Sequence, residues 1–160
     1  MAWTSPRTWV SGEVPTAANF NTHVRDNLKA IGDAWTSYTP TWTALTTPPA
    51  IGNGSVTGAY MQAGKLVHGR ARILAGSTTT YGAGIYTVSL PVPALAVTLG
   101  VIGHGLINNT GTSSFYRFAT LLTTSTIILR DPSAVDWTPT APFTFGNTDF
   151  TEITFTYEAA

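Results

Sequence analysis

The pattern of the sequence changes near Tyr38, and this change limits the possible folds more than any other feature. Before it, an extended segment with Trp3 and Trp9 leads into one amphipathic stretch with helical spacing. After it, short strand-like runs alternate with turn residues rich in Thr, Gly and Pro. The sequence therefore predicts an N-terminal arm and helix over residues 1–35 and a β-domain over residues 36–160.

A cap residue and the spacing of apolar residues predict the helix. Thr16 is a good N-cap, because its side chain can accept a hydrogen bond from an amide of the first turn. The apolar residues that follow recur at spacings of four, four and three, and together they are called the helix stripe: Phe20, Val24, Leu28 and Ile31. On a regular α-helix the stripe covers an arc of about 80°, which is narrow for a core-facing surface and favours a seam between identical helices.

Asn27 lies at the edge of the helix stripe. A buried amide in such a seam lowers stability but fixes the register between identical helices, so Asn27 is a candidate packing residue of an oligomer. The alternative interpretation places the helix on its own β-domain or on a neighbouring protein, with Asn27 exposed.

The arm ahead of the helix contains residues that are typical anchors in protein interfaces. They show no periodicity and are Trp3, Pro6, Trp9 and Val10. Large aromatic side chains are favoured at the desolvated centres of interfaces, so the arm is predicted to dock onto another protein. Alternatively, Trp3 and Trp9 fold back onto their own domain.

Short strands separated by turn residues predict a mainly β domain, an antiparallel β-sandwich or a jelly-roll-like fold. The predicted strands are Thr41–Leu45, Ser55–Gln62, Leu66–Leu74, Ile85–Leu90, Thr98–Ile107, Ser114–Leu122, Thr126–Arg130 and Phe150–Tyr157. Alternation within the last strand places Ile153, Phe155 and Tyr157 on the core side.

The strand Leu66–Leu74 contains the one local concentration of positive charge in the sequence. Alternation places Val67, Ala71 and Ile73 on the inner side, and it places a basic trio on the outer side: His68, Arg70 and Arg72. The trio has three possible roles: an ordinary solvated strand face that protects an edge from aggregation, salt bridges between subunits, or contact with a ligand.

Composition argues against several classes of function. Lys plus Arg equal Asp plus Glu at eight each, and charged residues are 10% of the chain, so no global field attracts nucleic acid or an anionic membrane. So low a charge density favours coverage by identical subunits, although Thr can also supply neutral polarity. No transmembrane helix and no secretory signal are expected, which predicts synthesis in the cytoplasm.

Motifs of catalysis are also missing, which predicts a protein that is not an enzyme and has no cofactor. The glycines at 58 and 64 do not have the spacing of a phosphate loop, and no G-x-S-x-G nucleophile elbow is present. The three histidines lie in three different predicted elements, and the absence of cysteine excludes thiolate zinc sites. The candidate carboxylate pairs for glycoside hydrolysis lie beside turn residues; they are Asp131 with Asp136 and Asp149 with Glu152.

Two parts of the sequence resemble a known family. The first comprises WTSPRTWVSGEV at 3–14, TAANFN at 16–21 and VRDNL at 24–28, and it resembles the N-terminal attachment segment of small tailed-bacteriophage virion proteins, especially of phages that infect actinobacteria. The second comprises YTPTWT at 38–43, PAIGNG at 49–54 and GKLVH at 64–68, and it is similar to the β-domain that often follows this segment. The resemblance extends to about Pro91.

Proteins of this family are labelled minor tail protein, head fibre or decoration protein. The resemblance implies a non-enzymatic, trimeric structural protein of the virion, whose partners are two further copies of itself and other virion proteins of the capsid or tail. An alternative function is a receptor-binding module of the tail that recognises host cell-wall glycan through exposed aromatic side chains such as Tyr81, Tyr116 or Trp137.

Overall fold

The structure is a computed structural model that describes residues 3–96 and 100–160. A helical segment precedes the strands and comprises α1 (Ala17–Phe20), a π-helical turn (Asn21–Arg25) and α2 (Asp26–Gly32). The strands are β1 (Thr36–Tyr38), β2 (Trp42–Ala44), β3 (Ser55–Ala63), β4 (Leu66–Leu74), β5 (Tyr86–Ser89), β6 (Val101–Asn109), β7 (Ser114–Leu122), β8 (Thr126–Arg130) and β9 (Phe150–Glu158). The predicted mainly β fold, preceded by an extended arm and a short helix, is confirmed.

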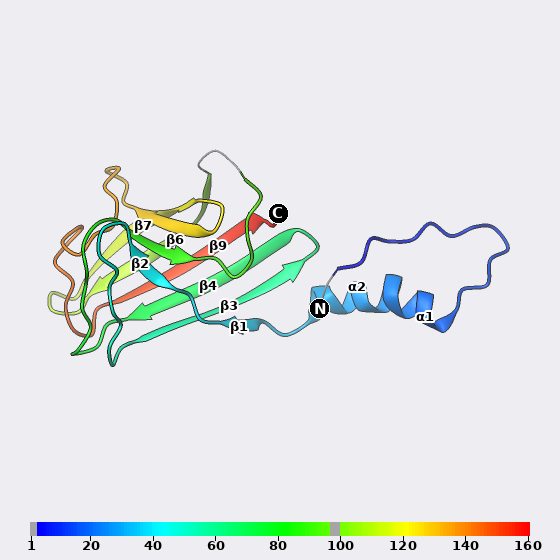
Figure 1. The fold of residues 1–160 in the computed structure, drawn as a ribbon, viewed down its shortest axis with the longest axis horizontal. Coiled ribbons are helices and arrows are strands. Elements are labelled where there is room, and N and C mark those ends of the chain that lie inside the picture. The colour runs from blue at the N-terminus through cyan, green and yellow to red at the C-terminus, as the bar shows by residue number, and fades with distance from the viewer. Residues whose placement is uncertain (1–2, 97–99) are drawn as a thin grey trace.

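The nine named strands form one continuous sheet that curls around the core (Figure 1). Their order is β1-β3-β4-β9-β6-β7-β8-β5-β2, and neighbouring strands are antiparallel. Both edge strands, β1 and β2, come from the single segment 36–44, so this part of the chain runs from one edge of the sheet to the other. A sandwich would have two separate sheets packed face to face. Here one curled sheet encloses the core instead.

The strand bounds follow the sequence pattern closely where alternation is strong. The predicted ranges of β4, β7 and β8 match the structure, and those of β2, β3, β5 and β9 differ by one residue at one or both ends. The strand predicted over Thr98–Ile107 is observed as β6, which begins at Val101 and ends two residues later than predicted, at Asn109. Positions 98–99 lie outside the described residues. The three-residue strand β1 was not predicted, because so short a segment shows no alternation.

Side chains of the central strands fill the core as predicted. Ile153, Phe155 and Tyr157 of β9 are buried, and so are the inner residues of β4. Glycines in neighbouring strands leave room for rings to lie over the sheet, because a Cβ at Gly69 would overlap the ring of Phe155 and one at Gly105 would overlap the ring of Phe118.

A cluster of aromatic rings fills the opposite part of the core. The indoles of Trp42 and Trp137 stack with ring centroids 6.2 Å apart, and Tyr86 meets Trp137 edge to face at 4.6 Å. Trp137 is only 3% exposed, so its predicted role in an exposed ligand site is wrong. The backbone explains the burial: the amide of Trp137 donates to the carbonyl of Leu129 and its carbonyl accepts from Tyr86, which joins this segment to the sheet.

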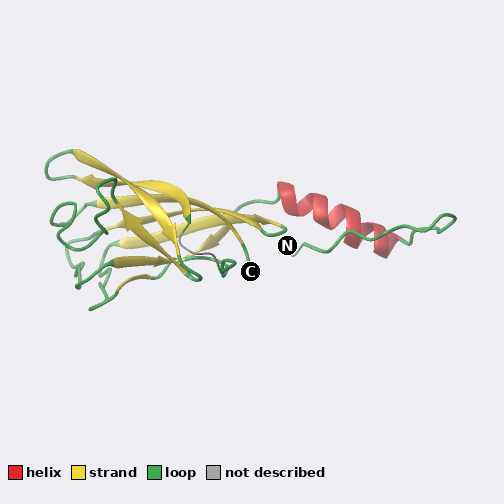
Figure 2. Cartoon of the chain, turned by 90° about the horizontal axis from the view of Figure 1, so that it is seen from above, coloured by secondary structure: helices red, strands yellow, loops and turns green. Residues whose placement is uncertain are grey.

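The helix extends away from one end of the β-domain, and the arm lies alongside it (Figure 2). Thr16 caps the first turn as predicted, because its Oγ1 accepts a hydrogen bond from the amide of Asn19 at 3.2 Å. The π-helical turn was not predicted: the amide of Asp26 donates to the carbonyl of Asn21, five residues earlier. The arc calculated for a regular α-helix therefore does not hold across the helix stripe.

Candidate functional site

The arm and the helix form a hairpin that is held by the side chain of Asn27. Its Oδ1 accepts a hydrogen bond from the amide of Thr4 at 3.0 Å, and its Nδ2 donates to the carbonyl of Thr4 at 2.8 Å. Nδ2 also donates to the carbonyl of His23 at 3.2 Å, within the π-helical region. Asn27 is 6% exposed, so the alternative with an exposed Asn27 is wrong, and a role in the register between identical helices stays a prediction. Within the chain, its amide fixes the arm.

Two further contacts stabilise the same hairpin. Nδ1 of His23 lies 3.1 Å from the carbonyl oxygen of Ser5, as expected for a ring N–H that donates to this oxygen. Farther out, Arg7 and Glu13 form an ion pair, and the guanidinium of Arg7 lies 5.1 Å from the ring centroid of Trp9. The arm thus has a defined conformation along the helix.

The helix stripe remains largely uncovered, because the arm occupies a different side of the helix. Phe20 is 54% exposed, Leu28 is 65% exposed and Ile31 is 53% exposed, while Val24 is half-buried. The described β-domain does not cover these three side chains, so the alternative in which the helix packs on its own β-domain is wrong for the stripe. Most of the apolar surface of the stripe therefore faces solvent in the described structure.

The predicted anchor residues of the arm are all exposed, and one of them, Trp3, also contacts the β-domain. The ring of Trp3 lies against the β3–β4 turn, where a Cβ at Gly64 would be 3.8 Å from ring atoms. Pro6, Trp9 and Val10 are exposed on the arm. Trp3 therefore touches its own β-domain but stays 42% exposed, so the alternative of folding back holds only in part for Trp3. A role of the arm in attachment stays a prediction.

The basic trio of β4 points outward, as predicted, and contacts neighbouring side chains. The guanidinium of Arg70 lies 5.1 Å from the ring centroid of Trp35, which follows the helix. The ring of His68 meets Trp35 at 5.3 Å, and its Nδ1 lies 2.8 Å from Oγ1 of Thr156. Trp35 therefore connects the base of the helix to the outer face of the sheet.

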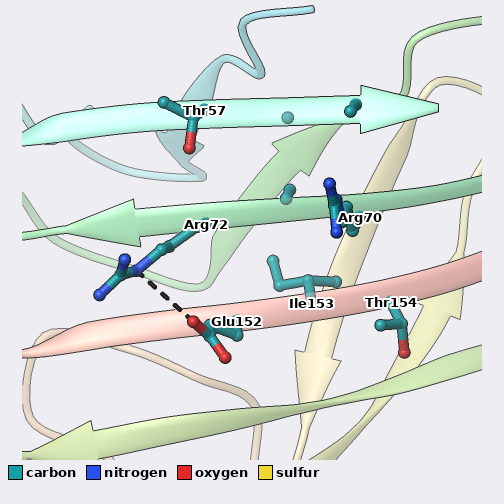
Figure 3. A pocket seen from close by; sticks show the side chains of 9 residues that line it. Thr57, Arg70, Arg72, Glu152, Ile153 and Thr154 are labelled. Carbon is teal, nitrogen blue, oxygen red and sulfur yellow. Dashed lines mark ion pairs between the residues drawn. The ribbon is translucent and has the colours of Figure 1, made fainter. Parts of the chain in front are cut away.

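The third member of the trio pairs with β9. Nε of Arg72 lies 3.6 Å from a carboxylate oxygen of Glu152 (Figure 3). The guanidinium of Arg72 also lies 5.0 Å from the ring centroid of Phe150. Both Arg72 and Glu152 are half-exposed, so solvent screens this ion pair and its contribution to stability is small.

Two adjoining hollows lie on this outer face. The first has a volume of about 470 Å³ and is lined by side chains of β3, β4 and β9, among them Thr57, Arg70, Arg72, Glu152 and Thr154 (Figure 3). The second has a volume of about 680 Å³, shares Glu152 and Thr154 with the first, and adds His104, Leu106 and Arg117. Sequence reasoning missed His104 and Arg117, because alternation assigns a face within one strand and does not identify the neighbouring strands.

The carboxylates considered for glycoside hydrolysis have structural partners. Oδ1 of Asp136 accepts from Nε of Arg130 at 2.6 Å, and this hydrogen bond raises the pKa of Arg130. Oδ1 of Asp131 accepts from the amides of Ser133 and Val135 within its own turn.

The remaining buried carboxylate joins two loops. Asp149 is 4% exposed; its Oδ1 accepts from the amide and hydroxyl of Thr110, and its Oδ2 accepts from the amide of Gly146 at 2.7 Å. These hydrogen bonds to Asp149 therefore join the β6–β7 turn to the loop that leads into β9.

Residues 3–96 and 100–160 contain no cluster of three or more His, Cys, Asp or Glu side chains arranged to hold a metal ion. Within the same ranges, no helix has the length and apolar composition needed to cross a membrane.

Comparisons of this chain with protein-family models, curated proteins and solved structures gave no match.

Proposed function

We propose that the protein is a non-enzymatic structural component of a bacteriophage virion, a trimeric surface appendage anchored by its N-terminal arm to the capsid or tail. The observation that supports this most directly is the helix that projects from the β-domain with Phe20, Leu28 and Ile31 exposed. The class of protein comes from the resemblance of the arm and the first half of the β-domain to virion proteins.

The occupants proposed for the helix stripe are the helices of two further copies of this chain. The helix from Ala17 to Gly32 is about 24 Å long, which is marginal for an isolated helix in water. Burial of Phe20, Leu28 and Ile31 among three helices removes this apolar area from solvent, and the β-domains add contacts between subunits. The arm covers another side of each helix through Asn27, so it stays on the outside of the bundle.

Light scattering of the full-length protein tests the trimer. The expected mass is three times the chain mass of 16.9 kDa at micromolar concentration. A charge in the stripe, Leu28→Asp, is expected to give the monomer mass, because an unpaired carboxylate in an apolar seam is unfavourable. The matched control is Leu45→Asp, at an apolar side chain of the β-domain that is 69% exposed. A monomer mass for the unchanged protein contradicts the trimer.

Incorporation into particles tests the anchor. Tagged full-length protein is expected to co-purify with intact virions, whereas the variant Trp9→Ser with Val10→Ser is expected to be absent from them and to keep its circular dichroism. Both residues are exposed, so their replacement leaves the β-domain intact. Normal incorporation of this variant contradicts attachment through the arm.

A further inference from the structure

The outer face of the sheet combines unpaired positive charge with a concave shape. Arg70, Arg72 and Arg117 border the two adjoining hollows, and Glu152 is the one carboxylate among the residues that line them. Glu152 pairs with Arg72, whereas Arg70 and Arg117 form no ion pair with any residue in the described ranges. The site therefore has two guanidinium groups free to bind an anion, in a chain whose net charge is zero.

The strand register spreads these charges along the face. Arg72 of β4 lies opposite Glu152 of β9, which lies opposite Leu106 of β6, which lies opposite Arg117 of β7. Arg72 and Arg117 are at the two ends of this row, three strand spacings apart. Their Cα atoms are therefore about 14 Å apart across the sheet. A small anion cannot contact both ends of this face, but an extended ligand with several charges can.

Short side chains form the floor between the arginines. Ala59 lies opposite Arg70 on β3, and Thr154 lies opposite it on β9. Thr57 and Thr154 are exposed and add hydroxyl groups, and His104 adds a ring nitrogen from β6. The floor is open and combines apolar surface with these few polar groups, which suits a sugar chain that offers both C–H faces and hydroxyl groups.

An aromatic ring borders the same face. Trp35 is 39% exposed, and the guanidinium of Arg70 stacks over its ring at 5.1 Å. Stacking limits the conformations of the arginine while its N–H groups remain free to bind a carboxylate or phosphate with two hydrogen bonds. The rest of the indole remains available for the C–H face of a sugar.

We propose that this outer-face hollow binds an acidic saccharide chain, whose carboxylate or phosphate groups contact Arg70 and Arg117 and whose hydroxyl groups contact Thr57, Thr154 and His104. The combination of guanidinium, hydroxyl and indole groups favours this class over nucleic acid, because the chain has a pI of about 6.8 and no extended basic surface for a phosphate backbone. The proposal does not depend on the virion role or on the trimer.

Calorimetric titration of the full-length protein at low salt tests the proposal. The probes are trigalacturonic acid for carboxylates, a trisaccharide phosphorylated on each sugar for phosphates, neutral galactotriose, and galacturonic acid as the single-sugar anion. At least one of the two charged oligomers is expected to bind, with an affinity that falls as salt rises. The neutral trisaccharide and the single sugar are expected to bind at least about tenfold more weakly, because one lacks charge and the other contacts one end of the face.

Two variants with equal loss of charge separate the site from a general charge effect. Arg70→Gln with Arg117→Gln is expected to lower the affinity by at least about tenfold, because both anion contacts are lost. The control, Arg25→Gln with Lys65→Gln, removes two exposed charges elsewhere and is expected to stay within about twofold. All four side chains are exposed, so thermal unfolding is expected to be unchanged.

Several outcomes overturn the proposal. They are no binding of either charged oligomer, equal losses in the two double variants, tighter binding of a DNA oligonucleotide, or binding of galacturonic acid as tight as that of its trimer. Amide chemical-shift mapping gives a second, independent readout: ligand-induced shifts are expected at residues 57, 70, 104, 117 and 154, and shifts confined to the arm contradict the site.

Discussion

Phe155 and Gly69 provide the most direct test of how the core is built. Phe155 of β9 is 1% exposed, and its ring lies over Gly69 of the neighbouring strand β4, the residue paired with it in the register. Phe155→Ala removes a buried ring and leaves a cavity, so the free energy of unfolding is expected to fall by about 3 to 5 kcal/mol.

Gly69→Ala perturbs the same contact from the opposite side. The new Cβ would overlap Cε2 and Cζ of Phe155, and the ring must move within a packed core. Such overpacking costs about 1 to 3 kcal/mol, more than the roughly 0.5 to 1 kcal/mol that an alanine gains over glycine in a strand. In the Phe155→Ala background the ring is absent, so the same substitution is expected to be neutral or stabilising. The two changes should therefore be coupled by about 1 to 3 kcal/mol.

Urea unfolding followed by tryptophan fluorescence measures these free energies, at one fixed protein concentration so that self-association does not alter the comparison. The matched control is Phe115→Ala, because Phe115 is 59% exposed, and its effect is expected to stay within about 0.5 kcal/mol. A loss below about 1 kcal/mol for Phe155→Ala, or additive effects of the two core changes, refutes this description of the core.

Three further predictions follow from single contacts. Asn27→Ala removes both hydrogen bonds to Thr4, so amide exchange of Thr4 is expected to accelerate while exchange in the β-domain stays unchanged; equal exchange rates contradict the role of Asn27. Thr16→Ala removes the helix cap and is expected to destabilise the helix by about 1 kcal/mol, seen as faster exchange of the early helical amides. Burial raises the pKa of Tyr157 to about 12, so its contribution to stability is complete below its ordinary pKa of about 10 and is lost as the pH rises towards 12. In Tyr157→Phe, whose lost hydroxyl donates to the carbonyl of Val92, the stability should be lower at neutral pH and should fall less between pH 10 and 12.

Local patterns in the sequence predicted those strands in which one face is buried and the other is exposed. The bounds of β4, β7 and β8 matched, and the inner residues of β9 were assigned correctly, because alternation depends only on neighbouring residues. The order of strands was not predictable in the same way. β4 and β9 are far apart in the sequence, and periodicity contains no information about which strands pair.

Trp137 shows how a long-range contact overrides a local pattern. It follows Asp136 in a segment of turn residues, which favours a loop with an exposed ring. In the structure its backbone bonds to Leu129 and Tyr86, and these two contacts direct the indole into the aromatic cluster. Both partners come from other parts of the sheet, so no local signal predicted the burial.

Asn27 was identified as important, but its partner was not predicted. Helical spacing placed the amide beside the helix stripe, and a second helix was the expected contact. The backbone of Thr4 fills that position instead, because the extended arm has unpaired amide and carbonyl groups that the Asn27 side chain can satisfy. This contact leaves the helix stripe itself uncovered, so Asn27 and the stripe have different surroundings: Asn27 holds the arm, whereas Phe20, Leu28 and Ile31 are exposed.

The core and the outer-face hollow are set by the same strand register. Alternation along β9 buries Ile153 and Phe155 and directs Glu152 and Thr154 to the outer face. The position of β9 and β6 between β4 and β7 then places Arg70 and Arg117 on one surface, although β4 and β7 are not neighbours in the sheet. A slip of one residue in the β4–β9 pairing would expose Phe155 and bury Glu152 without a partner, at a large cost in free energy. The burial that stabilises the domain therefore also fixes the arrangement of the arginines, without requiring any direct contact between them.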